Sequence, residues 1–231
     1  MYAKFLKRAI DFVFSLVAVI VLSPILLILI IVGAFVMKGN PFFVQKRPGK
    51  KDKNGNEKIF NLIKLRTMSN KKDAEGNLLP DEARLNKYGK ILRSTSLDEL
   101  PELFNIIKGD MAIVGPRPQL VRDMVFMSDE QRRRHNIRPG LTGLAQINGR
   151  NSITWEQKFE YDLQYIDKGI TFIGDVSIIF QTVGKVLKRS DIVREGTVSD
   201  MDYGDWLLRE SKITPEEYAK KQKEARIILK I

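Results

Sequence analysis

An uncharged apolar segment near the N-terminus constrains this chain more than any other feature. Residues 12–37 contain no charged side chain. As one continuous helix they would be about 39 Å long, which exceeds a bilayer hydrocarbon core of about 30 Å. The segment is too long for the apolar part of a secretory signal peptide, and no small-residue cleavage site follows it. We therefore expect this segment to fix the chain to a membrane.

The dipeptide Ser23-Pro24 lies at the middle of the segment and predicts a break in the helix. Pro24 has no backbone N–H to donate to the carbonyl of Ile20, and its ring opens that turn. The hydroxyl of Ser23 is able to bond a freed carbonyl, which makes a break tolerable within lipid. The pattern favours a helix that turns back at mid-depth.

Positive charge on both flanks of the segment supports the same topology. Lys7 and Arg8 precede it, and a stretch rich in lysine and arginine follows at residues 38–53. Flanks of this kind stay on the cytoplasmic side of a membrane. We predict a re-entrant helix-break-helix over residues 1–38. A single spanning helix is the alternative, and either topology leaves the larger part of the chain in the cytoplasm.

Composition limits what that larger part can be. The chain has 231 residues, enough for one domain and an anchor, and its net charge of +11 favours anionic partners. It has no cysteine and one histidine, His135, which excludes thiolate and multi-histidine metal sites. Any metal must be held by oxygen, as Mg²⁺ is. We expect a cytoplasmic domain at residues 39–200 and a charged, helical tail at residues 201–231.

Hydrophobic patterning predicts an α+β fold that is predominantly helical, with one small antiparallel β element. The β element is a hairpin of residues 42–45 and 59–65, joined by a polar turn. Helices are predicted at residues 96–108, 128–137, 155–167 and 176–188, and from Thr214-Pro215 onward. The pattern of residues 176–188 suits a helix at a membrane interface and equally suits core packing.

Two adjacent carboxylates, Asp98 and Glu99, are the first candidates for chemistry. At the start of a helix such a pair has a purely structural explanation, because negative charge there interacts favourably with the helix dipole. However, Arg93 lies just upstream, and Arg117 is held between two prolines, which presents a rigid planar donor for phosphate. The loop of residues 138–150 adds two more arginines, several glycines and amide side chains. Together with the anchor, these residues suggest phosphate chemistry at a lipid surface.

Several stretches, in order along most of the chain, carry a resemblance to a known family. They are Lys7-Arg8 with Ser23-Pro24, Gln45-Lys46-Arg47-Pro48-Gly49, Lys64-Leu65-Arg66-Thr67-Met68, residues 93–103, Val114-Gly115-Pro116-Arg117-Pro118, and residues 138–150. The chain resembles the bacterial sugar transferase family of monotopic phosphoglycosyl transferases, and among them the small, PglC-like members.

The resemblance implies transfer of a sugar 1-phosphate from a UDP-sugar to polyprenyl (undecaprenyl) phosphate, with release of UMP. This is the first membrane step of glycoconjugate biosynthesis, at the cytoplasmic face of the bacterial inner membrane. UDP-N,N′-diacetylbacillosamine is the donor that the PglC-like character favours, and UDP-Gal or UDP-Glc are the alternatives. Inner-membrane lipid is a further expected partner, and self-association into a homo-oligomer stays open.

Roles for individual residues follow from the resemblance. Asp98 is implied as the nucleophile that forms a covalent phosphosugar-aspartyl intermediate and as a ligand of Mg²⁺, with Glu99 assisting. The residues expected to bind phosphates and nucleotide are Lys64, Arg93, Arg117, Arg138, Gln146 and Arg150.

Two other classes of function compete with this interpretation. A basic membrane-associated binding protein would account for the charge, but the sequence has no aromatic residues interleaved with a basic patch, so nucleic acid is not an expected partner. A metal-dependent glycosyltransferase would use an Asp-x-Asp motif, and Asp200-Met201-Asp202 has that spacing. The tripeptide is short and has no supporting pattern around it, and such an enzyme would release UDP rather than UMP.

Overall fold

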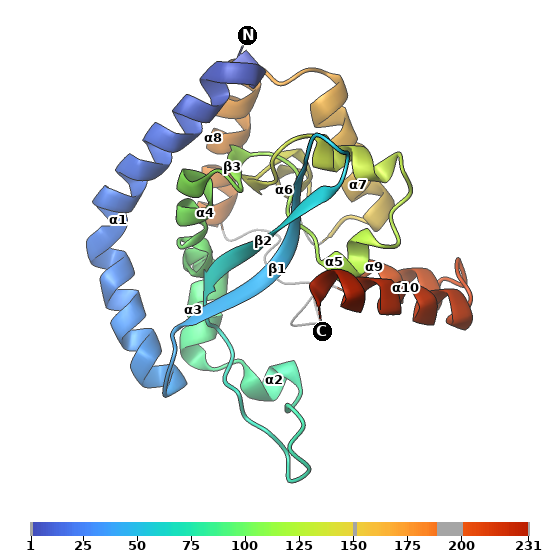
Figure 1. Cartoon of the computed structure of the whole chain (residues 1–231). Coiled ribbons are helices and arrows are strands. Elements are labelled where there is room, and N and C mark those ends of the chain that lie inside the picture. Colours follow the sequence, from blue (N-terminus) through green and yellow to red (C-terminus); the bar gives the residue numbers. More distant parts are fainter. Residues whose placement is uncertain (1, 150–151, 189–200, 231) are drawn as a thin grey trace.

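The computed structural model describes residues 2–149, 152–188 and 201–230. A two-stranded hairpin lies between the long N-terminal helix α1 on one side and the helices α9 and α10 on the other (Figure 1). The helices are α1 (Lys7–Met37), α2 (Asp81–Arg84), α3 (Lys87–Thr95), α4 (Glu102–Lys108), α5 (Val121–Met124), α6 (Leu144–Ile147), α7 (Trp155–Asp167), α8 (Phe172–Lys188), α9 (Tyr203–Arg209) and α10 (Pro215–Leu229). The strands are β1 (Phe42–Lys51), β2 (Glu57–Leu65), β3 (Ala112–Val114) and β4 (Gly140–Thr142).

The helix α1 does not contain the predicted break. It runs without interruption from Lys7 to Met37, with Pro24 inside it, and follows a curved path (Figure 1). The local chemistry is as predicted, because the hydroxyl of Ser23 donates to the carbonyl of Ile20 at 2.7 Å. That bond satisfies the carbonyl that Pro24 leaves without an N–H partner, so the helix continues through the proline.

Most of α1 presents apolar side chains to the outside. Within the described part of the chain, it is the one helix long and apolar enough to cross a membrane. Its exposed large side chains include Phe14, Val21, Ile28 and Phe35. A surface this apolar is unusual for a soluble protein and is typical of a protein in contact with lipid.

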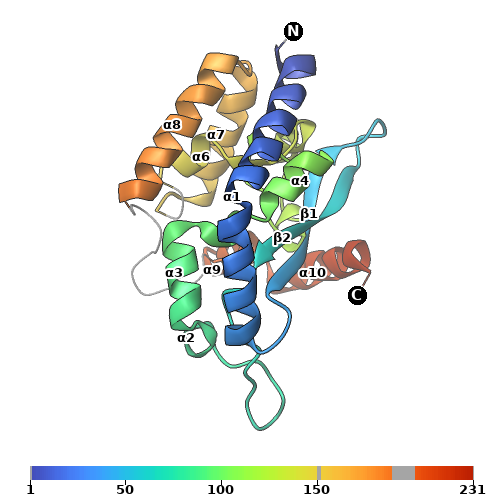
Figure 2. The same ribbon diagram turned by 90° about the vertical axis from the view of Figure 1, so that its left-hand side faces the viewer.

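Both ends of α1 are fastened to the rest of the protein. Near its start, Lys7 donates to Asp175 of α8 at 2.7 Å. Near its other end, the hydroxyl of Tyr88 in α3 donates to the carbonyl of Leu29 at 2.7 Å. Helices α1, α3, α4 and α8 consequently share one face of the molecule (Figure 2).

The predicted hairpin is confirmed and is longer than predicted. Strands β1 and β2 pair antiparallel, with Phe42 opposite Leu65. Phe60 and Leu62 of β2 pack with Leu103 and Ile106 of α4, and this cluster is the core beneath α1. A second, parallel pair, β3 with β4, was not predicted, because its strands have three residues each and carry no periodic pattern.

The helix predicted over residues 96–108 is divided in two. Ser96 adopts a left-handed conformation with φ of 56°, which ends α3. A single 3₁₀ turn, η2 (Leu97–Glu99), follows it. After Pro101, α4 begins, and Gly109 ends it with φ of 94°, as its position predicted. Asp98 and Glu99 therefore lie on a tight turn rather than on the first turn of a long helix.

The remaining predicted helices are confirmed with one change of type. The helix over residues 155–167 is α7, capped by Thr154, and α8 begins four residues before the predicted start, at Phe172. The segment predicted as helix over 128–137 is instead the 3₁₀ helix η3 (Gln131–Asn136). The tail forms α9 and α10, and Ala225 of α10 is buried against α5.

Candidate functional site

Glu99 lies at the centre of a network of ion pairs. Its Oε1 atom accepts from Lys64 Nζ of β2 at 2.8 Å and from Arg117 Nη2 at 2.6 Å. Arg117 comes from the loop after β3, so three separate elements meet at one carboxylate. The neighbouring charge of Glu99 raises the pKa of Arg117 further above its ordinary value. Glu99 is thereby held in a fixed position by two cations.

Asp98 has different surroundings from its neighbour. It is half-buried, and within the described part of the chain no hydrogen bond or ion pair engages its carboxylate. Burial, together with the negative charge of Glu99, raises the pKa of Asp98 above its ordinary value. A carboxylate that lacks a fixed partner beside several cations is available to a substrate, as a nucleophile must be.

A third carboxylate, Glu102, was missed by the sequence analysis. It is the first residue of α4, is almost fully buried, and accepts from Lys64 Nζ at 3.1 Å. Burial raises the pKa of Glu102. The sequence shows that Glu102 lies three residues after Glu99. However, only the tight turn at η2 brings both carboxylates to Lys64.

The carboxylates of Asp98 and Glu99 face a polar cleft of about 1330 Å³. Arg93, Arg117 and Lys64 line this cleft, as do Arg47 and Lys158. Arg93 Nε donates to the hydroxyl of Thr67 at 3.0 Å, which holds its guanidinium beside Asp98. The structure therefore brings together three of the predicted phosphate-binding cations with the predicted catalytic pair.

Gln146, also predicted to bind substrate, lines the same cleft from α6. Its side chain is 9% exposed, and neither its Oε1 nor its Nε2 atom has a hydrogen-bond partner among the described residues. A buried amide without partners is costly, by about 1–3 kcal/mol, unless a ligand satisfies it. Because Gln146 lines the cleft, this amide is a candidate to contact a ligand there.

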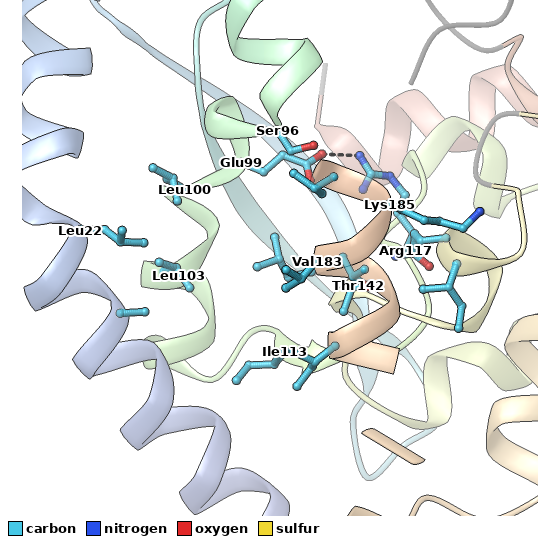
Figure 3. Close-up of a pocket in the computed structure, with 17 residues that line it drawn as sticks. Leu22, Ser96, Glu99, Leu100, Leu103, Ile113, Arg117, Thr142, Val183 and Lys185 are labelled. Carbon is cyan, nitrogen blue, oxygen red and sulfur yellow. Dashed lines mark hydrogen bonds and ion pairs between the residues drawn. The ribbon is translucent and has the colours of Figure 1, made fainter. Parts of the chain in front are cut away.

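A second, apolar pocket of about 310 Å³ adjoins the polar cleft at Glu99. Glu99, Arg117 and Gln146 line both this pocket and the polar cleft. Figure 3 shows Glu99 and Arg117 at one end of the pocket, with Leu22 of α1 and Leu103 of α4 farther along it. The site thus joins a charged compartment to an apolar one.

One predicted substrate-binding residue, Arg138, is not among the residues that line the cleft. Arg138 Nε donates to the carbonyl of Gly109 at 2.7 Å, at the C-terminal end of α4. Arg8 lies at the same end and donates to the carbonyls of Ile106 and Ile107 at 2.6 and 2.7 Å. Both arginines thus bind carbonyls that a helix end leaves open. Arg150 lies outside the described residues.

The tail contributes residues to the polar cleft, which the sequence analysis did not predict. Met201, Asp202, Asp205 and Leu229 line it. The tail is held there by the backbone N–H of Tyr203, which donates to Asp123 at 2.8 Å, and by an ion pair between Arg122 and Asp202. Of the Asp-x-Asp tripeptide, Asp200 lies outside the described residues. The placement is tertiary, because it depends on contacts with residues about 80 positions earlier in the chain.

The predicted Mg²⁺ can be tested against this set of donors. No group of three or more acidic, histidine or cysteine side chains is gathered for a metal among the described residues. Mg²⁺ usually binds one or two carboxylates and completes its shell with water and substrate phosphates. Asp98, with the charge of Glu99 beside it, fits such a substrate-bridged ion, whereas a cage built from protein alone does not fit.

Fold and site together define a class of protein. A long, outward-facing apolar helix is packed against a domain whose cleft combines acidic residues with arginines and lysines. Such an arrangement suits a membrane-associated protein that acts on phosphate-bearing molecules. The chain belongs to the bacterial sugar transferase family, whose sequence pattern matches residues 2–189.

Individual relatives agree with this assignment. An uncharacterized sugar transferase, EpsL, of Bacillus subtilis is 44% identical over 84% of this chain and 93% of its own length. A UDP-glucose:undecaprenyl-phosphate glucose-1-phosphate transferase of Klebsiella pneumoniae is 40% identical over 78% of this chain, but over only 39% of its own length. An undecaprenyl-phosphate galactose phosphotransferase of Salmonella typhimurium is 32% identical over 81% of this chain and 41% of its own length.

Proposed function

We propose that this protein transfers a sugar 1-phosphate from a UDP-sugar to polyprenyl phosphate and releases UMP. The observation that carries the proposal is the free carboxylate of Asp98 among Lys64, Arg93 and Arg117, at the wall of a large polar cleft. Catalysis of phosphoryl transfer depends mainly on positioning and on stabilisation of charge, and these cations supply both. The Klebsiella and Salmonella relatives, whose names state this type of reaction, support the same chemistry.

In the first step, a carboxylate oxygen of Asp98 attacks the β-phosphorus of the donor. The new bond joins that oxygen to phosphorus, and the bond from the β-phosphorus to the bridging oxygen breaks, so that UMP leaves with the electron pair. In the second step, a phosphate oxygen of the acceptor attacks the same phosphorus and releases the carboxylate. A covalent intermediate lets one site serve a water-soluble donor and a lipid acceptor in turn.

The side chains around Asp98 have complementary roles in this scheme. Arg117 and Lys64 are fixed by Glu99 and bind the phosphates, and Arg93 adds a third positive charge near the nucleophile. Gln146 offers its unpartnered amide to the donor or to the acceptor phosphate. Asp98 and the donor phosphates would hold Mg²⁺, which when bound neutralises negative charge on the diphosphate.

We further propose that α1 lies within one leaflet rather than across the bilayer. A helix of 31 residues is about 46 Å long, yet contacts near both its ends hold it to the same domain. A domain outside the membrane could not contact both ends of a helix that crosses it. Exposed apolar side chains on α8, including Phe172 and Phe180, extend the lipid-facing surface.

The topology is testable with a cysteine introduced before Lys4, because the chain has no cysteine of its own. In intact cells we expect no reaction with a membrane-impermeant thiol reagent until the membrane is permeabilised. A cysteine in a periplasmic loop of another protein provides the positive control. Labelling from outside would establish a spanning helix instead.

The donor is proposed to be a UDP-hexose, with UDP-Glc and UDP-Gal first in order because these sugars occur in the names of relatives. UDP-N,N′-diacetylbacillosamine stays a prediction that a panel of UDP-sugars tests. Each donor is incubated with purified protein, Mg²⁺ and undecaprenyl phosphate, and the nucleotide product is identified. UMP supports the proposal, whereas UDP would indicate a metal-dependent glycosyltransferase.

The role of Asp98 is tested by Asp98→Asn, which retains shape but removes the nucleophile. We expect this variant to lose UMP release and to fail to become labelled by a donor with radioactive phosphorus at the β position. Asp110→Asn is the matched control, because Asp110 lies at the opposite end of α4 with its own lysine partners. Labelling of Asp98→Asn at the wild-type level would overturn the assignment.

A further inference from the structure

We propose that the apolar pocket between α1, α4 and α8 binds the phosphate-proximal part of the acceptor's prenyl chain, with the acceptor phosphate at the Glu99–Arg117 end. This inference rests on the proposed function and adds a place for the lipid. The term "apolar pocket" refers throughout to the pocket lined by Ala18, Leu22, Leu103, Ile113, Ile179 and Val183 together with Glu99, Arg117 and Lys185.

The pocket has distinct ends. Ser96, Glu99, Arg117 and Lys185 gather at one end, and Leu22, Leu103 and Ile113 lie toward the other (Figure 3). A prenyl phosphate has the same division, because a single branched hydrocarbon chain begins directly at an anionic group. The two cations, Arg117 and Lys185, complement that anion. A neutral lipid would leave this end of the pocket without a matching group.

The charged end is also the end that meets the polar cleft. Glu99, Arg117 and Gln146 line both spaces, and Asp98 lies next to Glu99 on the same 3₁₀ turn. A phosphate bound there is adjacent to the carboxylate that would carry the phosphosugar. The lipid therefore reaches the site from the apolar pocket and the donor from the polar cleft, and the acceptor phosphate can attack the phosphorus once UMP has left.

The other walls of the pocket connect it to the lipid-facing surface. Ala18 and Leu22 belong to α1, whose outward side chains are apolar. Val183 of α8 lines the pocket and is still 51% exposed, so the pocket opens at this helix beside the exposed ring of Phe180. A hydrocarbon chain can pass from the bilayer into the pocket without contact with water, and its transfer is not opposed by the hydrophobic effect.

The size of the pocket suits the first units of a prenyl chain. A volume of about 310 Å³ corresponds to roughly ten water-sized groups at about 30 Å³ each. That is enough for about two isoprene units. The rest of a long polyprenyl chain would lie in the bilayer along α1 and α8.

Tryptophan substitutions that fill the pocket test the proposal. In Val183→Trp and Ala18→Trp we expect the KM for undecaprenyl phosphate to rise at least tenfold. UMP release in the absence of acceptor, which reports the first step alone, should stay within twofold of wild type. The matched controls are Ile173→Trp on α8 and Val17→Trp on α1, since both residues are exposed and neither lines the pocket. The controls should leave both measurements unchanged.

A direct binding measurement covers the case in which a substituted protein does not fold. Wild-type protein is irradiated with geranyl phosphate that carries a diazirine on its terminal unit, and the modified peptides are identified by mass spectrometry. We expect labels on the pocket segments of α1, α4 and α8, with competition by undecaprenyl phosphate but not by inorganic phosphate or phosphatidylglycerol vesicles.

The outcomes separate this inference from the proposed function. If wild-type protein releases no UMP with any donor, the proposed function fails. If wild-type protein transfers sugar phosphate but the pocket variants keep their KM for the lipid, the inference alone is wrong. Labels confined to the outer face of α1, or competition by phosphatidylglycerol, would likewise overturn it.

Discussion

The two ends of α4 carry charged residues from the same set of motifs, yet they have different surroundings. At the N-terminal end, Asp98 and Glu99 face a cleft, and Asp98 is left without a partner among the described residues. At the C-terminal end, the guanidinium groups of Arg8 and Arg138 are bound to backbone carbonyls. Both arrangements agree with the helix dipole. The difference shows that a charged motif residue becomes available for chemistry only where it faces open space.

The largest expected effect follows from removing a cation at the N-terminal end. Arg117→Leu should reduce kcat/KM for UMP release by about 100-fold or more, because one fixed charge that stabilises the transferring phosphoryl group is lost. The measurement is UMP release by folded, monodisperse protein at saturating Mg²⁺. A loss below about threefold would remove Arg117 from the site and weaken the contrast between the two ends.

The next largest effect is expected at the C-terminal end of α4, and it is an effect on stability rather than on activity. Arg138→Leu leaves the carbonyl of Gly109 without its charged donor, so the free energy of unfolding should fall by about 1–3 kcal/mol. Thermal unfolding in detergent measures the loss, and kcat/KM per folded molecule should stay within threefold of wild type. A large loss of activity with unchanged stability would return Arg138 to the substrate-binding residues.

A charged cluster that touches neither end of α4 provides a reference for acid stability. Burial lowers the pKa of His135 to about 4, and despite burial the hydrogen bonds from His135 and Arg132 hold the pKa of Glu57 at about 2. The unfolded chain binds these protons at higher pH than the folded one, so stability is lost as pH falls. For His135 the loss runs from about pH 6.5 to 4 and amounts to about 3 kcal/mol.

His135→Gln isolates that contribution, because the amide still donates to Glu57 but does not titrate. As pH falls from 7 to 4, the free energy of unfolding should fall more in the wild type than in the variant. Urea unfolding at several pH values measures it. A difference that does not change with pH would show that His135 titrates normally in the folded protein.

The smallest effect is expected from the exposed lysines near the C-terminal end of α4. Lys108 pairs with Asp110 at 3.3 Å, but its side chain is 70% exposed. Lys108→Ala should change the free energy of unfolding by less than about 1 kcal/mol, because water screens such a pair. A larger loss would mean that exposed charge, and not Arg8 and Arg138, stabilises this end of α4.

Local patterns in the sequence determined much of this protein. The uncharged run of α1, the alternating residues of the hairpin and the caps of α7 and α10 are short-range signals, and the elements follow them. The adjacent pair Asp98 and Glu99 was likewise visible without a structure. In each case, neighbours along the chain are also neighbours in space, so pattern and structure coincide.

Only the tertiary structure decided which charged residues meet. Glu99 is joined to Lys64 and Arg117, which are 35 and 18 residues away, and the tail reaches the cleft from beyond residue 200. Arg138 is directed to α4 by a contact that spans 29 residues. Similarly, the continuity of α1 through Pro24 depends on one serine hydroxyl together with packing against α3, α4 and α8. Residue type sets what a side chain can do, and the packing of distant elements sets what it faces.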